Sequence, residues 1–144
     1  MGKREVTVVE SGAGRFGQFI TAGHHVLGAD EPEPLGGCDT GPDPYELLLS
    51  GLGACTAMTL RMYAERKHMA LTKVSVHLRH VARAAEGNAS NDAFERIITL
   101  EGDLSDADRQ RLLDVADRCP VSQTLQRGSR IASSLAPLSA GAAT

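Results

Sequence analysis

The feature that most constrains this 144-residue chain is an apolar segment over residues 47–58 that follows a strong helix-start signal. Asp43 is a good N-cap, Pro44 fits the first helical position, and Glu46 falls where the acid of a capping box lies. These residues predict a helix from residue 44 to about residue 67. Because its first half is apolar on nearly every side, we expect the helix to be buried. Either a three-layer monomer or a dimer in which two such helices pack together would bury it.

Two cysteines lie on or beside predicted helices. Cys55 lies within the apolar segment, and Cys119 opens the sequence Cys119-Pro120-Val121-Ser122. With Cys38, which matches no motif, the chain has three cysteines, an odd number that excludes a complete disulfide framework. The N-terminus has no signal-peptide pattern, and no stretch approaches the ~20 apolar residues of a membrane span, so we expect a cytoplasmic protein. In a reducing compartment, two thiols that can meet suggest redox chemistry more than a structural disulfide.

The composition fits a single domain over residues 1–144. Apolar residues make up 42% of the chain and charged residues 23%, which is typical of a globular protein. A chain of this length can bury a core without disulfides or metal. Aromatic residues are only 3% and the formal net charge is -3, so nucleic acids and anionic membranes are disfavoured as partners.

The rest of the chain alternates between strand and helix signals. A helix is predicted from the N-cap Ser105 to about residue 118, and a short one from Cys119-Pro120 to about residue 126. Residues 29–44 form a loop and residues 84–91 a turn, which makes a hairpin of the strands beside that turn. Strands are predicted over residues 5–10, 18–21, 24–27, 71–83, 94–101 and 129–138. This order predicts an α+β fold with antiparallel sheets.

Neither the histidines nor the glycines predict a bound metal or cofactor. His77 and His80 are three residues apart on a predicted strand, so their side chains point to opposite faces. The turn Ser11-Gly12-Ala13-Gly14 is not followed by a helix, so it is not a phosphate-binding loop. No Gly-x-Ser-x-Gly nucleophile elbow is present. We therefore expect no metal and no other cofactor.

Two motifs together resemble the OsmC/Ohr family, which includes organic hydroperoxide resistance proteins and osmotically induced peroxidases. They are Pro44-Tyr45-Glu46-Leu47-Leu48 running into Gly53-Ala54-Cys55, and Cys119-Pro120-Val121-Ser122. The resemblance covers essentially the whole chain. It implies an OsmC-like fold in which antiparallel sheets wrap around the central helices of an intertwined homodimer. It also implies reduction of organic hydroperoxides in oxidative-stress defence, with a dithiol or lipoyl-type reductant.

The resemblance further implies roles for individual residues. Cys55 is expected to be the peroxidatic thiol and Cys119 the resolving one. Arg15, in a glycine-rich turn, matches the arginine that activates the thiolate. In the better-known branches of the family an acid directly follows the proline, and an acid near the helix start pairs with that arginine. Here Tyr45 takes that place and Glu46 comes one residue later, which rotates the acid by about 100° around a helix.

The residues themselves make the two thiols unequal. Cys55 lies in mid-helix in apolar surroundings, which would raise its pKa, so it needs a cation such as Arg15. Cys119 lies at a helix start, where the dipole and free N–H groups favour a thiolate. On local physics Cys119 is the more acidic thiol, whereas the resemblance assigns the first attack to Cys55. An apolar substrate pocket for Cys55 could be lined by Leu49, Leu52 and Met58.

Glu46 lies nine residues before Cys55, roughly 13 Å along the helix axis and on the opposite face. If it orients Arg15 near a cysteine, that cysteine belongs to the other subunit, so we expect a site built across a dimer interface. The alternatives stay open at this point: Glu46 as a capping-box acid only, and Arg15 as a solvated turn residue. The alternative function is a non-catalytic dimeric carrier of small molecules or lipids.

Overall fold

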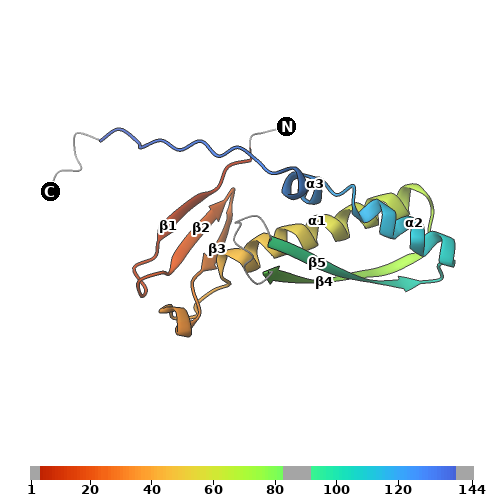
Figure 1. Cartoon of the computed structure of the whole chain (residues 1–144), viewed down its shortest axis with the longest axis horizontal. Coiled ribbons are helices and arrows are strands. Elements are labelled where there is room, and N and C mark those ends of the chain that lie inside the picture. Colours follow the sequence, from red (N-terminus) through yellow and green to blue (C-terminus); the bar gives the residue numbers. More distant parts are fainter. Residues whose placement is uncertain (1–3, 83–91, 139–144) are drawn as a thin grey trace.

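The computed structural model describes residues 4–82 and 92–138, and shows two antiparallel sheets and three α-helices (Figure 1). The predicted turn over residues 84–91 lies outside the described residues. The α+β class with antiparallel sheets is confirmed. The elements in chain order are β1 (Thr7–Glu10), β2 (Gln18–Ala22), β3 (His25–Ala29), the 3-10 helix η1 (Glu33–Leu35), α1 (Pro44–Arg66), β4 (Leu71–Ala82), β5 (Asp92–Gly102), α2 (Asp106–Ala116) and α3 (Pro120–Arg127).

The local helix signals act as the sequence predicts. The Asp43 carboxylate accepts a hydrogen bond of 2.8 Å from the backbone N–H of Glu46, and Pro44 occupies the first turn of α1. Ser105 caps α2 in the same way, accepting from the N–H of Asp108 at 3.0 Å. In Figure 1, α1 runs along the β4–β5 hairpin, and α2 and α3 pack against α1.

The expectation that α1 is buried on every side is wrong for a single chain. One face is buried by the hairpin and the other helices, at Leu52, Gly53, Thr56, Leu60, Tyr63 and Ala64. The other face carries an open stripe, spaced by three or four residues, in which Met58 is 65% and Met62 68% exposed. The open stripe consists of Leu48, Gly51, Cys55, Met58 and Met62. One chain has too few elements to cover both faces of its longest helix.

Because α1 has 23 residues and a mean hydropathy of 1.2 over an 18-residue window, its length and composition alone would allow it to cross a membrane. The expectation that no stretch approaches a membrane span is wrong on this point. Core helices of soluble proteins have the same properties, and α1 packs against protein on one face.

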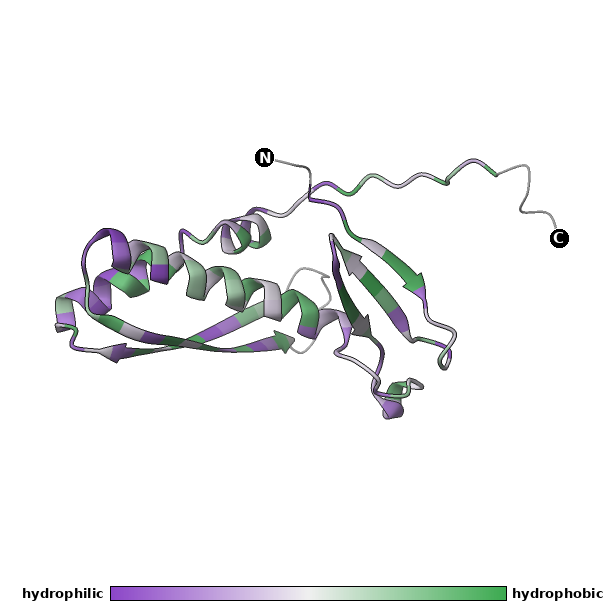
Figure 2. Cartoon of the chain, turned by 180° about the vertical axis from the view of Figure 1, so that it is seen from behind, coloured by the Kyte–Doolittle hydropathy of each residue, from purple (hydrophilic) through white to green (hydrophobic). Residues whose placement is uncertain are grey.

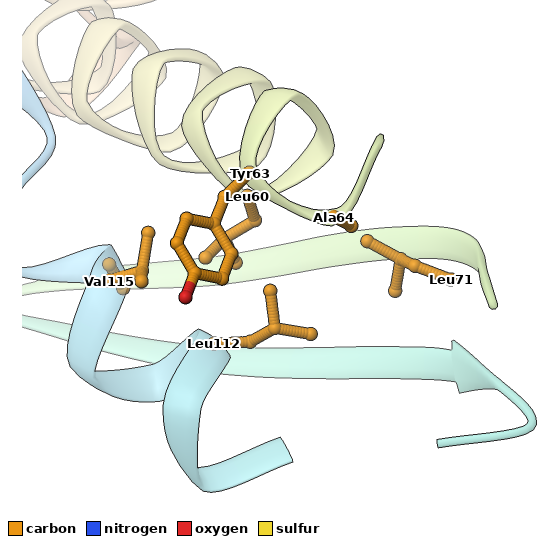
Figure 3. Packing of buried hydrophobic residues seen from close by; sticks show 7 residues of the cluster. Leu60, Tyr63, Ala64, Leu71, Leu112 and Val115 are labelled. Atoms are coloured by element: carbon orange, nitrogen blue, oxygen red, sulfur yellow. The ribbon is translucent and has the colours of Figure 1, made fainter. Parts of the chain in front are cut away.

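The main core lies where the C-terminal half of α1 meets α2 and the base of the hairpin (Figure 3). Leu60 and Leu112 are fully buried there, and the Tyr63 ring lies between the two helices with its hydroxyl accepting from Arg111 Nε at 2.8 Å. The strands of the hairpin alternate between half-buried and exposed residues along β4 and β5. That alternation is the pattern from which the hairpin was predicted.

The N-terminal sheet β1–β2–β3 packs against no helix extensively in the described part of the chain. Most of its large apolar side chains are exposed, and Figure 2 shows apolar stretches along its strands. The loop that leaves β3 is instead held by Asp30, whose buried carboxylate accepts from the N–H groups of Glu31, Cys38 and Thr40 and from the Thr40 hydroxyl. Hydrogen bonds therefore hold this end of the molecule, while its apolar surface stays open.

The predicted strand over residues 129–138 is not formed. Residues 128–138 have no regular structure, and Ile131 and Leu135 are 90% and 97% exposed. Figure 1 shows the segment as an extended tail that leaves α3 without joining either sheet. A strand needs a neighbour for its backbone hydrogen bonds, and the single chain offers none to this segment.

Candidate active site

Two thiols from distant parts of the sequence meet between α1 and α3. Helix α1 presents Cys55 near the middle of its length, and Cys119 occupies the N-cap position of α3, directly before Pro120. Both are free, and each is a side-chain neighbour that affects the ionisation of the other. Cys119 is fully buried, whereas Cys55 is half-buried on the open stripe. The pair therefore has one thiol that solutes can reach and one that they cannot.

The surroundings move the two thiol pKa values in opposite directions. Burial raises the pKa of Cys55, and the neighbouring Cys119 thiol raises it further. Burial acts on Cys119 too, but the Cys55 thiol, the N–H groups of Ser122 and Val121 and the Thr56 hydroxyl outweigh it and lower the pKa of Cys119. Those N–H groups belong to the first turn of α3, the helix start from which an acidic Cys119 was expected.

Arg15 does not reach the thiols within this chain. It lies in the turn between β1 and β2, which is closed by a hydrogen bond of 2.9 Å from Ser11 N–H to the Gly17 carbonyl. Its guanidinium lies 4.6 Å from the centre of the Phe16 ring. Gly36 lies close by, since a Cβ added to it would come 3.7 Å from Arg15 Nη1. Figure 1 shows this turn at the edge of the N-terminal sheet, away from α3.

Cys38 lies beside the turn that carries Arg15. Its thiol is exposed, and a Cβ added to Gly14 would lie only 2.7 Å from its sulfur. Gly14 also has a φ of +68°, so both the backbone conformation and the close approach require glycine there. Cys38 thus packs against this turn, and it is not among the groups that affect the ionisation of Cys55 or Cys119.

Glu46 does not touch Cys55 in the same chain. Its side chain is exposed in the first turn of α1, where it lines a hollow of about 420 Å³ on the β4 side of the helix. Tyr45, which takes the place of the family acid, stacks on His80 with ring centres 4.5 Å apart. His80 in turn bonds Asp92 at 2.8 Å. Tyr45, in the place of the family acid, therefore packs on the hairpin and does not bind any of the described arginines.

In the described part of the chain, the three residues expected to line one apolar pocket for Cys55 do not share a hollow. Leu49, Leu52 and Met58 line three different hollows, of about 420, 360 and 540 Å³. They diverge because residues at these spacings point in different directions around a helix. Of these three residues, only Met58 lies on the open stripe that carries Cys55.

Two residues that no sequence motif singled out lie next to the buried thiol. The Thr56 hydroxyl is a side-chain partner of Cys119, and Arg96 donates to the same hydroxyl at 3.0 Å. Arg96 lies on β5 between Phe94 and Ile98, at a position that faces the helices. A charged residue in an otherwise apolar, core-facing register was the sequence signal that could have identified it.

Comparison with known proteins identifies the fold. The family model of OsmC-like proteins matches residues 36–134. A comparison with curated proteins gave no match. Among solved structures, an OsmC-like protein from Mycoplasma pneumoniae is similar with a TM-score of 0.74 and 21% identity, over 87% of this chain and 88% of that one.

Two further structures are of proteins named for hydroperoxide resistance. The organic hydroperoxide resistance protein OsmC of Legionella pneumophila gives a TM-score of 0.67 at 20% identity, over 88% of this chain and 90% of that one. An organic hydroperoxide resistance protein from Elizabethkingia anophelis, with thiocyanate bound, gives 0.65 at 18% identity, over 88% and 89%. At these identities the comparison establishes the fold alone.

Proposed function

The chain belongs to the OsmC-like protein family, and on that premise we propose that it is a cytoplasmic thiol-dependent peroxidase that reduces organic hydroperoxides in oxidative-stress defence. Cys55 is the attacking thiol and Cys119 the resolving thiol. The observation that carries the proposal is the meeting of a half-buried and a fully buried thiol from distant parts of the sequence. Relatives of the same fold are named for hydroperoxide resistance, which supports this substrate class.

In the first step the Cys55 thiolate attacks the terminal oxygen of the hydroperoxide. The S–O bond forms, the O–O bond breaks, and the alkoxide leaves with the electron pair and takes up a proton to become the alcohol. Cys55 remains as a sulfenic acid. Exposure supports Cys55 in this role, because Cys119 has no solvent-exposed surface through which a substrate could reach it.

In the second step the Cys119 thiolate attacks the sulfur of the sulfenic acid. The S–S bond forms, the S–O bond breaks, and hydroxide leaves and is protonated to water. The lowered pKa of Cys119 supports this role, since the attacking thiol must be ionised. A dithiol or lipoyl-type reductant then reduces the disulfide and is itself oxidised to a disulfide.

The proposed enzyme is a homodimer, because Cys55 needs a cation and none of the described groups that affect its ionisation is one. The open stripe repeats at intervals of three and four residues, which is the spacing of a seam between two packed helices. A second copy on this stripe would cover Met58 and Met62 and enclose Cys55. Arg15 would then reach Cys55 from the partner subunit, and Glu46 would be available to orient it.

Consumption of cumene hydroperoxide in the presence of dithiothreitol tests the proposal. The unmodified protein is expected to consume it, and Cys55→Ser is expected to abolish consumption because it removes the attacking sulfur. Cys38→Ser is the matched control, since Cys38 is an exposed cysteine outside the pair. Equal rates in the unmodified and Cys55→Ser proteins would contradict the proposal.

A carrier of small apolar molecules is the second candidate, favoured by the apolar hollow of about 540 Å³ beside Met58 and Met62. Intact mass after mild treatment with peroxide separates the two functions. Loss of two hydrogens, mapped to a bond between Cys55 and Cys119, supports the peroxidase. Thiols that remain unreacted favour the carrier.

A further inference from the structure

Arg96 is a mostly buried cation on the face of the hairpin that packs against the helices. Its neighbours in the same register of β5 are Phe94, Ile98 and Leu100, all apolar and half-buried. The Arg96 side chain is only 14% exposed. Burying a guanidinium is costly unless its donors are satisfied, so its hydrogen-bond partners indicate why it is there.

The partners of Arg96 come from α1 and from the end of α2, just before the buried thiol in the chain. Nη1 donates to the Thr56 hydroxyl on α1 at 3.0 Å and to the Ala116 carbonyl at the end of α2 at 3.2 Å. Nη2 pairs with the Asp117 carboxylate at 3.0 Å. The guanidinium also lies at the C-terminus of α2, where the helix dipole favours a positive charge. Arg96 therefore joins α1, β5 and the corner that leads from α2 into α3.

Two of these partners also contact Cys119. The Ala116 carbonyl accepts a hydrogen bond of 3.2 Å from the backbone N–H of Cys119, so one oxygen holds both Cys119 and Arg96. The Thr56 hydroxyl is a side-chain partner of the Cys119 thiol. Because Arg96 donates to that hydroxyl, the single hydroxyl proton is left for the Leu52 carbonyl, 2.7 Å away, or for the thiol.

We propose that Arg96, acting through Thr56 and Ala116, is the positioning residue that holds Cys119 ready to attack Cys55. This inference rests on the proposed function, since it assigns Cys119 the resolving step. Arg96 touches neither a substrate nor the reacting sulfur. Arg96 holds the Ala116 carbonyl, which accepts from the backbone N–H of Cys119. It also holds the Thr56 hydroxyl, which is a partner of the Cys119 thiol. When Cys119 ionises, Thr56 turns its proton from Leu52 to the sulfur.

The other arginines with hydrogen bonds in this region serve different parts of the fold. Each one binds a backbone carbonyl of the hairpin or a residue of the main core. Arg61 donates to the Leu71 carbonyl, Arg109 to the carbonyls of Leu100 and Gly102, and Arg111 to the Tyr63 hydroxyl. Among the described residues, only Arg96 donates to two groups that also contact Cys119.

A stepwise reaction with Ellman's reagent tests the inference without any hydroperoxide. In a Cys38→Ser background, Cys55 displaces one thionitrobenzoate and becomes a mixed disulfide. Cys119 then attacks the Cys55 sulfur. The Cys55–Cys119 bond forms, the bond to the reagent breaks, and a second thionitrobenzoate leaves with the electron pair. The rate of this second release, followed against pH, reports on Cys119 alone.

Arg96→Met is expected to slow the second release by about tenfold, which is the rate equivalent of one hydrogen bond to a charged group. It should also move the pH profile of that step upward, while leaving the first release unchanged. Thr56→Val should act in the same direction, and Thr56→Ser, which keeps the hydroxyl, should restore both rate and profile. Arg79→Met is the matched control, because Arg79 forms an exposed ion pair with Glu95 on the same hairpin.

The inference would be overturned if the second release in Arg96→Met had the same rate and pH profile as in the Cys38→Ser protein. It would also be overturned if Arg79→Met slowed the second release as much as Arg96→Met does. Circular dichroism shows whether Arg96→Met folds. If it does not, Thr56→Val decides, since it retains Arg96. A normal second release in the absence of any hydroperoxide consumption would defeat the proposed function while leaving the assignment of Arg96 intact.

Discussion

The two ends of the molecule use their apolar residues in opposite ways. At the end formed by α2, the hairpin base and the C-terminal half of α1, Leu60 and Leu112 are fully buried. In the N-terminal sheet, comparable side chains such as Phe19 and Val26 are more than half exposed. One chain is therefore sufficient to complete one end and not the other, since exposed apolar surface of this extent marks an interaction site.

The candidate site lies on the border between these two kinds of structure. Cys119 belongs to the packed side, where it is fully buried and held by the corner between α2 and α3. Cys55 lies on the open stripe of α1. Under the proposed function, a single chain thus builds the resolving position, whereas a second copy would complete the attacking position.

The largest effect is expected in the packed end. Leu112→Ala should lower the free energy of unfolding by ~2–5 kcal/mol, because it removes a fully buried side chain and leaves a cavity. The matched control is Leu113→Ala, since Leu113 is the next residue on α2 and is 53% exposed. It should change stability by less than about 0.5 kcal/mol. Urea unfolding measures both, and similar losses would break the distinction between a packed and an open side.

The second prediction concerns the open stripe. Met58→Lys should raise the dissociation constant of the proposed dimer by at least about tenfold, because burying a methionine contributes ~1.5–3 kcal/mol and 1.4 kcal/mol is tenfold. Sedimentation at several concentrations measures it. Leu113→Lys is the control, with an exposed apolar residue that lies off the stripe. A protein that is monomeric before substitution would show that the open side is not completed by a copy of this chain.

What the sequence predicted correctly was local. The start of α1 follows from Asp43 and Pro44, and the hairpin follows from alternation along a single strand. The placement of Cys119 at a helix start likewise depends only on Pro120 and the residues beside it. Signals of this kind span a few residues and do not need the rest of the fold.

What the sequence missed depends on distant neighbours. The segment over residues 129–138 has strand-forming residues but no strand beside it in one chain. The open face of α1 could not be predicted, because an apolar helix does not indicate how many elements surround it. Arg96 was overlooked because its importance depends on Thr56 and Ala116, which come from two other elements.

The third prediction concerns the N-terminal end, where polar contacts rather than apolar packing hold the loop after β3. The pKa of Asp30 lies below its ordinary value of 3.8. The hydrogen bond from the Thr40 hydroxyl contributes most, and the N–H groups of Glu31, Thr40 and Cys38 add to it. Together they outweigh burial, which raises the pKa. Such a carboxylate stabilises the folded loop above its ordinary pKa, and the stabilisation is lost as the pH falls through the lowered value. The amides of Cys38 and Thr40 should therefore lose protection from hydrogen exchange below pH 3.8.

Asp30→Asn should reduce the protection of these two amides at every pH, because it removes the charge that all the donors share. The Leu35 amide is the internal control, since it bonds the Pro32 carbonyl at 3.0 Å and not Asp30. Exchange measured by nuclear magnetic resonance reads the three amides in one experiment. Equal loss of protection at Leu35 would mean that the whole loop opens and that Asp30 is not its specific anchor.

The smallest effect compares two glycines of α1, one on each side of the helix. A Cβ added to Gly51 meets nothing within 4 Å, so Gly51→Ala should stabilise the isolated chain by up to about 1 kcal/mol through helix propensity. At Gly53 the added Cβ would lie 2.6 Å from Leu78 Cδ1, so that methyl group must move and Gly53→Ala should stabilise less than Gly51→Ala. If a second copy packs on the open stripe, Gly51→Ala should stabilise the monomer against urea and yet weaken the dimer in sedimentation. A gain in both measurements would mean that no backbone approaches Gly51, and that the helices of two copies meet elsewhere.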